Sequence, residues 1–264
     1  MKINRHKFHC FTLLISLMAS AYTFAQRGAP PVPPQTPREA ALIDLTGVWV
    51  SVISEDWRWR MLTPLRGDFA NIPLNAEGKR VGMAWDPEQD RAFGLECKAY
   101  GAANLMRVPG RLEISWEDDQ TLAIRTDAGN QTRRLHFNES TMPSEPQSLQ
   151  GYSMANWEKP LGTGDGSFTP PFFGARVGTA PRSLEVSTSN LTGGYLRKNG
   201  VPYSDQTTVQ EFFDYHVLPN GEEWFTVTTI VRDPVYLRTA YITSTDFKKQ
   251  NDMSGWNPSP CSAE

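Results

Sequence analysis

The chain has 264 residues, with 26 basic and 29 acidic side chains, a formal charge of −3 and eight Trp. This composition supplies a core and argues against disorder, and the slight negative charge argues against a nucleic-acid-binding surface over the whole chain. Twenty Pro and 20 Gly indicate many turns and few long helices.

Residues 1–25 have the three-part pattern of a secretory signal peptide. Three basic residues come first, apolar residues 11–18 (FTLLISLM) follow, and residues 23–25 (TFA) put small side chains before a cleavage site. Cleavage would remove three basic and no acidic residues and leave 23 basic and 29 acidic ones, a formal charge of −6. The protein is therefore expected in the periplasm or outside the cell. An uncleaved anchor is the alternative.

Residues 26–44 start with a Pro-rich stretch (QRGAPPVPPQTPRE) and are predicted to be an extended linker. Residues 45–264 are expected to form one β domain, with a short helix over 76–85 capped by Asn75 and a long loop at 159–181. Short alternating runs predict its strands, near 46–53, 56–61, 111–117, 121–127, 131–137, 151–158, 183–190, 207–217, 222–232 and 240–247.

Two consecutive hairpins can be aligned from their turns. Within 111–127 the alignment places Glu113 opposite Arg125, an opposite-charge pair worth roughly 0.2–1 kcal/mol. The next turn, at 129–130, places Arg125 opposite Arg134. One face then carries the apolar side chains Leu112, Ile114, Trp116, Leu122, Ile124, Leu135 and Phe137. The other face carries the polar side chains Arg111, Glu113, Arg125, Asp127, Thr132, Arg134 and His136.

A later hairpin turns at 219–221 (PNG), and its register places Phe213 opposite Val227 and Tyr215 opposite Phe225. The face that mixes aromatic and polar groups carries Phe212, Asp214, His216, Trp224, Thr226 and Thr228. Such a mixture is typical of a surface that holds a ligand. The alternative is one partly covered layer of a β-sandwich.

The polar face of the first hairpins holds groups for anion binding or acid–base chemistry. Inside a barrel, Arg125 and Arg134 would favour an anionic or carboxylate ligand. His136 with Glu113 or Asp127 could act as a general base. The alternative is the solvated outside of an antiparallel sheet, where polar and apolar residues are expected to alternate.

Further candidates lie elsewhere in the chain. His216 and Asp214 form a second His–carboxylate set for catalysis. Trp residues on the predicted strand 56–61 could hold a sugar or a flat ring, or pack in the core. Arg58 and Arg60, with Arg66 and Asp68, could form the rim of such a site. The Gly-bracketed loop 193–204, which contains Lys198, could bind a carbonyl or be a plain connection. The ligand-binding candidates outside the first hairpins are Trp57 and Trp59 of the first segment, Tyr195 and Arg197 of the loop, and Trp224 of the later hairpin.

Two Cys remain after signal cleavage. In an oxidising compartment Cys97 and Cys261 are predicted to form one disulfide, and a free thiol is the alternative. Only His136 and His216 would remain, so a His-rich zinc site is excluded, and no metal or cofactor is expected. The sequence also lacks the nucleophile elbow, the P-loop, the dinucleotide-binding glycines and the zincin motif.

Gly47-Val48-Trp49 resembles the start of lipocalin-like (calycin) barrels, in which the Trp packs across the closed end. Four blocks resemble an uncharacterised family of secreted bacterial β proteins: WDPEQD (85–90), CKAYGA (97–102), PGRLEISWEDDQTLAIRTDAGNQTR (109–133) and GYLRKNGVPYS (194–204). With the strand pattern, the resemblance implies a mainly β fold. We expect an antiparallel lipocalin-like barrel or a strongly curved β-sandwich of about 8–10 strands with one short helix.

The function predicted first is a secreted or periplasmic binding protein for a small, partly apolar ligand that could be anionic. The alternative is a cofactor-free periplasmic lyase, isomerase or hydrolase that uses His/carboxylate chemistry inside the barrel. A third function, partner binding, would need a large exposed apolar patch. The expected partner is a small molecule, with no nucleic acid and no transmembrane segment in the mature chain. The oligomeric state stays open.

Overall fold

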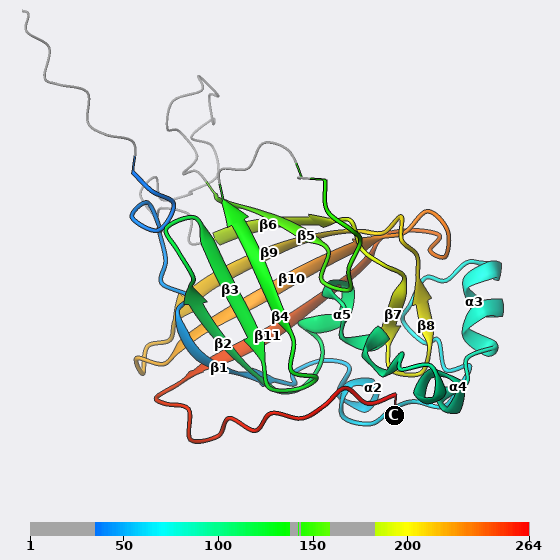
Figure 1. Ribbon diagram of the computed structural model, residues 1–264. Helices are drawn as coiled ribbons and strands as arrows, with labels where there is room; N and C mark the ends of the chain where they lie inside the picture. The colour runs from blue at the N-terminus through cyan, green and yellow to red at the C-terminus, as the bar shows by residue number, and fades with distance from the viewer. Residues whose placement is uncertain (1–34, 138–141, 143, 159–182, 264) are drawn as a thin grey trace, which may run out of the picture. The chain divides into compact units, whose positions relative to one another are not determined.

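Nine strands close into a barrel in the computed structural model of the protein (Figure 1). The structure describes residues 35–137, 142, 144–158 and 183–263. The predicted signal peptide, residues 26–34 of the predicted linker and the predicted loop 159–181 lie outside these residues. The strands are β1 (Gly47–Val52), β2 (Arg111–Trp116), β3 (Thr121–Thr126), β4 (Thr132–Phe137), β5 (Tyr152–Trp157), β6 (Ser183–Ser189), β9 (Thr208–Val217), β10 (Glu223–Arg232) and β11 (Tyr241–Gln250).

The barrel closes because β1 pairs with both β2 and β11. Around the barrel the order is β1-β11-β10-β9-β6-β5-β4-β3-β2. Every neighbouring pair is antiparallel except β4 and β5, which are parallel. The prediction of a mainly β, barrel-like fold is therefore confirmed.

The smaller elements gather at one end of the barrel (Figure 1). They are α2 (Trp57–Met61), α3 (Ala76–Met83), α4 (Pro87–Ala92), the 3-10 helix η2 (Glu96–Tyr100), α5 (Ala102–Leu105), and a hairpin of β7 (Gly194–Arg197) and β8 (Val201–Tyr203). Strand β8 packs against α3, while β7 contacts η2 and α5. No helix in the described ranges has the length and apolar character that crossing a membrane requires.

Local sequence explains why the predicted helix after Asn75 forms and why the predicted strand at 56–61 does not. The helix after Asn75 is confirmed, because the Asn75 side chain accepts a hydrogen bond of 2.8 Å from the Gly78 amide. The strand at 56–61 is wrong. Asp56 has φ of 51°, a left-handed conformation that ends the extended chain, and its carbonyl accepts the first helical bonds of α2. The predicted loop 193–204 contains the β7–β8 hairpin.

The barrel interior is filled with apolar side chains. Trp49 is fully buried, donates from Nε1 to the Leu45 carbonyl at 2.8 Å, and packs edge-on against Phe225. The predicted apolar face lies inside: six of its seven residues are buried, and Trp116 packs half-buried against them. Alternation therefore divided the residues correctly into two faces, since side chains on a strand point to opposite faces in turn, and the structure shows that the apolar face is the inner one.

Two of the three predicted registers are confirmed. Glu113 pairs with Arg125, and the β9–β10 register agrees at both predicted pairs. The β3–β4 register is wrong by two residues, since Arg125 lies opposite Thr132 and not opposite Arg134. The turn is longer than predicted, because the Thr126 amide bonds the Gln131 carbonyl. A two-residue shift leaves every side chain on its predicted face.

The end of the predicted linker belongs to the barrel. Ile43 is buried in the core. The Pro37 carbonyl accepts a hydrogen bond of 2.8 Å from Trp157 Nε1, and the Arg38 amide bonds the Asp119 carbonyl. Residues 36–44 therefore belong to the same compact unit as the barrel.

An ion pair is buried inside the barrel. Arg133 of β4 and Glu211 of β9 have fully buried side chains, and Arg133 Nη2 lies 2.5 Å from Glu211 Oε2. Arg133 also donates to the hydroxyls of Ser153 and Thr188, which bond each other. The pair therefore joins four strands from within.

Substitution Glu211→Gln tests this pair. It leaves the charge of Arg133 buried and unpaired, so the free energy of unfolding should fall by about 3–5 kcal/mol in urea denaturation. Glu113→Gln is the matched control, because it removes an ion pair on the barrel exterior, and it should cost at most about 1 kcal/mol. Equal costs for the two variants would contradict the assignment.

Candidate functional site

The polar face predicted for anion binding or catalysis lies on the outside of the barrel. Arg125 and Glu113 form a 3.5 Å ion pair, with side chains 47% and 30% exposed. Arg134 pairs with a second glutamate at 2.7 Å and is also exposed. His136 stacks on the Tyr152 ring at 4.6 Å. The structure thus gives these residues the geometry of a solvated sheet face.

The other predicted catalytic residues do not join His136. Asp127 is buried, and its carboxylate accepts the backbone amides of Arg111 and Ala128, both at 2.7 Å, which fixes a turn. Asp214 is exposed on the outer face of β9. His216 lies two residues further along the same strand and is opposite Trp224 of β10 in the strand register. Strands β5 and β6 separate this face from β4.

Tyr195 belongs to a buried polar cluster next to the helices. Its hydroxyl lies 2.9 Å from the Asp90 carboxylate, which also accepts a hydrogen bond from Trp85 Nε1 at 3.0 Å. Burial raises the pKa of Tyr195, and the hydrogen bond to Asp90 adds to this shift. Tyr195 therefore stays protonated at neutral pH and joins β7 to α4.

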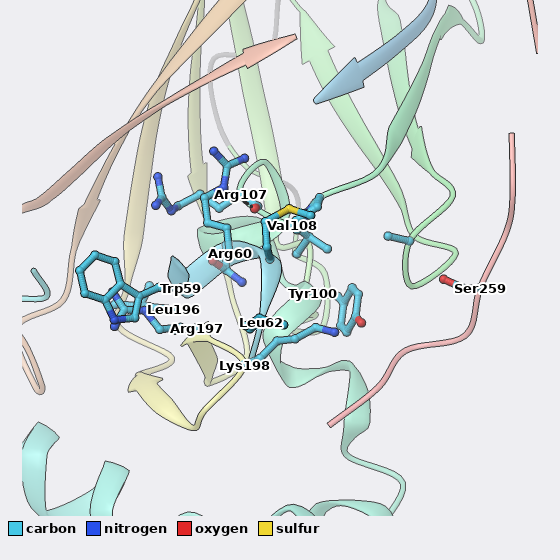
Figure 2. A pocket seen from close by; sticks show the side chains of 14 residues that line it. Trp59, Arg60, Leu62, Tyr100, Arg107, Val108, Leu196, Arg197, Lys198 and Ser259 are labelled. Carbon is cyan, nitrogen blue, oxygen red and sulfur yellow. Dashed lines mark hydrogen bonds between the residues drawn. The ribbon is translucent and has the colours of Figure 1, made fainter. Parts of the chain in front are cut away.

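A cavity of about 280 Å³ lies where α2, η2, α5, β7 and the C-terminal segment meet (Figure 2). Two predicted ligand-binding residues, Trp59 and Arg197, line it. Exposed Trp57 does not. Part of the cavity wall is apolar and is formed by Leu62, Val108, Pro109 and Leu196, among others. It also has four cationic side chains, which are Arg60, Arg107, Arg197 and Lys198.

Arg107 is neutralised by two carboxylates. Its Nη1 and Nη2 lie 2.7 Å from Glu55 and Asp56 respectively. Its carbonyl accepts a hydrogen bond of 3.0 Å from Arg60 Nε. These bonds connect the segment after β1 to the segment after α5, so the cavity wall is held from both sides.

Arg60 is the least satisfied cation of the cavity. Its side chain comes from α2 and the residue is 9% exposed. In the described part of the chain, neither Nη1 nor Nη2 has a hydrogen-bond partner. Burial, with the charge of Arg107 next, lowers the pKa of Arg60 to about 10. Arg60 is therefore still charged at neutral pH and lacks an acceptor for two of its nitrogens.

The other two cations of the cavity, Arg197 and Lys198, lie close to aromatic rings. Lys198 Nζ lies 5.4 Å from the centre of the Tyr100 ring, and Figure 2 shows its side chain extended toward that ring. The guanidinium of Arg197 lies 5.4 Å from the Trp59 ring. Trp59 Nε1 donates to Asp68 at 2.9 Å, and this hydrogen bond lowers the pKa of the Asp68 carboxyl. The hydrogen bond to Asp68 therefore fixes the orientation of the Trp59 ring.

The C-terminal segment forms one wall of the cavity. The predicted disulfide between Cys97 and Cys261 is present, with Cα atoms 5.0 Å apart. Ser259 lines the cavity, and its amide donates to the Asp127 carbonyl at 2.9 Å. The Ser262 amide lies 3.3 Å from the Tyr100 hydroxyl. The disulfide therefore holds a wall of the cavity.

Among the cationic and tyrosine side chains of the cavity, sequence reasoning marked Arg60 as a candidate rim residue and Lys198 as part of the loop 193–204, in addition to Arg197. It did not mark Tyr100 or Arg107. Nothing in the local pattern marks Arg107. Comparison of the chain with protein-family models, with curated proteins and with solved structures finds no match.

Replacement of Cys97 and Cys261 by Ala tests the role of the disulfide. On the chain-entropy model, opening a loop of 164 residues lowers the free energy of unfolding by about 4–5 kcal/mol. Thermal unfolding of the variant and of the wild type, each with and without dithiothreitol, measures this. The reductant should shift only the wild type, and a shift in both proteins would contradict the assignment.

Proposed function

We propose that the protein binds a small, partly apolar anion in the cavity beside α2. The observation that carries this proposal is the Arg60 guanidinium, which is buried, charged and without acceptors for two nitrogens. A buried unsatisfied donor costs about 1–3 kcal/mol, and more when it is charged. The two nitrogens are covered by neighbouring side chains, so a carboxylate or phosphate oxygen would reach them once those side chains shift, and it would then supply the acceptors in a fork-like geometry that suits Arg.

The surroundings of Arg60 support the same ligand class. Of the residues that line this cavity, all of them described, none is Asp, Glu or His. Four cations line it, and two carboxylates behind its wall pair with Arg107. The apolar side chains, among them Leu62 and Leu196, favour a ligand with a hydrocarbon part. The volume of about 280 Å³ suits a small molecule.

Binding is favoured over catalysis by the same lining. General acid–base chemistry needs a group that titrates near neutral pH within reach of the ligand. His136 and His216 lie on the barrel exterior, and the lining offers only Arg, Lys and Tyr as ionisable groups. The proposal places the protein in the periplasm or outside the cell, and the disulfide supports this, since disulfides persist in oxidising compartments.

Calorimetric titration with matched pairs of compounds tests the proposal. Octanoate and benzoate should bind, while the neutral octanamide and benzamide should bind at least ten-fold more weakly, because they lack the charge that Arg60 requires. Affinity for the carboxylates should also fall as the salt concentration rises.

A pair of variants locates the site. Lys198→Met removes a cation from the cavity and should weaken octanoate binding about ten-fold, a change of about 1.4 kcal/mol. Lys79→Met removes an exposed lysine of α3 outside the cavity and should leave affinity unchanged. Equal binding of the amides, or equal losses in both variants, would refute the proposed site.

A further inference from the structure

Exposed apolar side chains concentrate in one short segment. The described residues contain twelve exposed large hydrophobic side chains, and four of them lie within residues 57–65. Their exposed fractions are 66% for Trp57, 57% for Met61, 69% for Leu62 and 83% for Leu65. Large apolar side chains that are exposed together within one short segment are candidates for an interaction site.

The same segment is cationic. Arg58 and Arg66 are exposed, and residues 57–67 contain no Asp or Glu. Arg58, whose side chain is 69% exposed, forms an ion pair with Asp68 at 3.9 Å, and a pair of this length with an exposed Arg is weak. The chain as a whole carries a formal charge of −3. Residues 57–66, hereafter the docking segment, therefore combine apolar bulk with positive charge on a slightly acidic protein.

The docking segment borders the cavity. Met61 and Leu62 are exposed and also line the cavity wall. Figure 2 shows Leu62 next to Lys198 and Tyr100 at that wall. A surface that covered the docking segment would therefore lie beside the ligand site.

We propose that the docking segment binds the surface of a membrane that contains anionic lipid. Membrane-surface binding strengthens with buried apolar area and with attraction between cations and anionic headgroups. Trp and Arg suit this interface, because each has an apolar body and a polar end. The docking segment supplies four apolar side chains and two exposed Arg together.

A second copy of the chain fits less well. In a two-fold dimer each patch meets itself, so Arg58 and Arg66 would face the same cations of the other copy without carboxylates from residues 57–67 to compensate them. A headgroup phosphate supplies the opposite charge.

This inference rests on the proposed function in one respect, because it names the source of the ligand. An anion with a hydrocarbon part that is taken up next to a bilayer is an amphiphile such as a fatty acid. The docking segment would let the cavity exchange such a molecule with the membrane without a free passage through water.

Co-sedimentation with vesicles tests the docking. The wild type should bind vesicles of phosphatidylcholine mixed with phosphatidylglycerol at least ten-fold more strongly than vesicles of phosphatidylcholine alone. The double variant Trp57→Ser/Leu65→Ser should lose at least ten-fold of this binding. Neither residue lines the cavity, so the variant should still bind octanoate. Arg58→Gln/Arg66→Gln should reduce the preference for the anionic vesicles.

Val217→Ser is the matched control, since Val217 is 47% exposed at the end of β9, beside the β9–β10 turn at the end of the barrel opposite the helices (Figure 1), and vesicle binding should stay unchanged. Equal vesicle binding by the wild type and Trp57→Ser/Leu65→Ser would overturn the inference. So would a concentration-dependent dimer in sedimentation velocity that the same variant abolishes, because a second copy would then cover the segment. A wild type that binds vesicles but not octanoate would refute the proposed ligand and leave the docking intact.

Discussion

Arg107 forms ion pairs with Glu55 and Asp56, and through them it attaches helix α2 to the barrel. Glu55 also accepts the Ser244 amide of β11 at 3.2 Å, so the contact continues into the sheet. Arg60 is bonded to the carbonyl of Arg107. The cavity, its unsatisfied guanidinium and the exposed segment beside it all depend on this attachment, because each is built from α2.

The filled interior explains why the candidate site lies at the end of the barrel. Small barrels are filled by their own side chains, and larger ones leave room for a ligand. Here Trp49, Phe213 and Phe225 are fully buried inside the barrel, together with the Arg133–Glu211 pair. Helices and the β7–β8 hairpin cover one end, and the cavity forms where they meet the C-terminal segment.

The local charge around α2 is positive, whereas the chain as a whole is slightly negative. Carboxylates on the barrel exterior pair with Arg125 and Arg134, whereas cations around α2 exceed the carboxylates nearby. Two partly independent features follow from this local excess. Inside, a buried guanidinium lacks acceptors, and outside, exposed cations border apolar side chains. A single amphiphilic anion beside an anionic membrane would satisfy both.

The sequence by itself determined the mainly β class, the disulfide, the Asn75 helix cap and the division of strands into two faces. These follow from local rules, since strand side chains alternate with period two and a cap acts over three residues. Alternation does not say which face is inside when a barrel closes, so the polar face could be assigned to either side. The tertiary structure decided that, as it decided the parallel β4–β5 pairing. It also brought Arg60, Tyr100, Arg107 and Lys198 together from separate segments. This convergence depends on how the helices and the hairpin pack on the closed barrel. It cannot be predicted from local periodicity, because periodicity reflects only residues close together in the sequence.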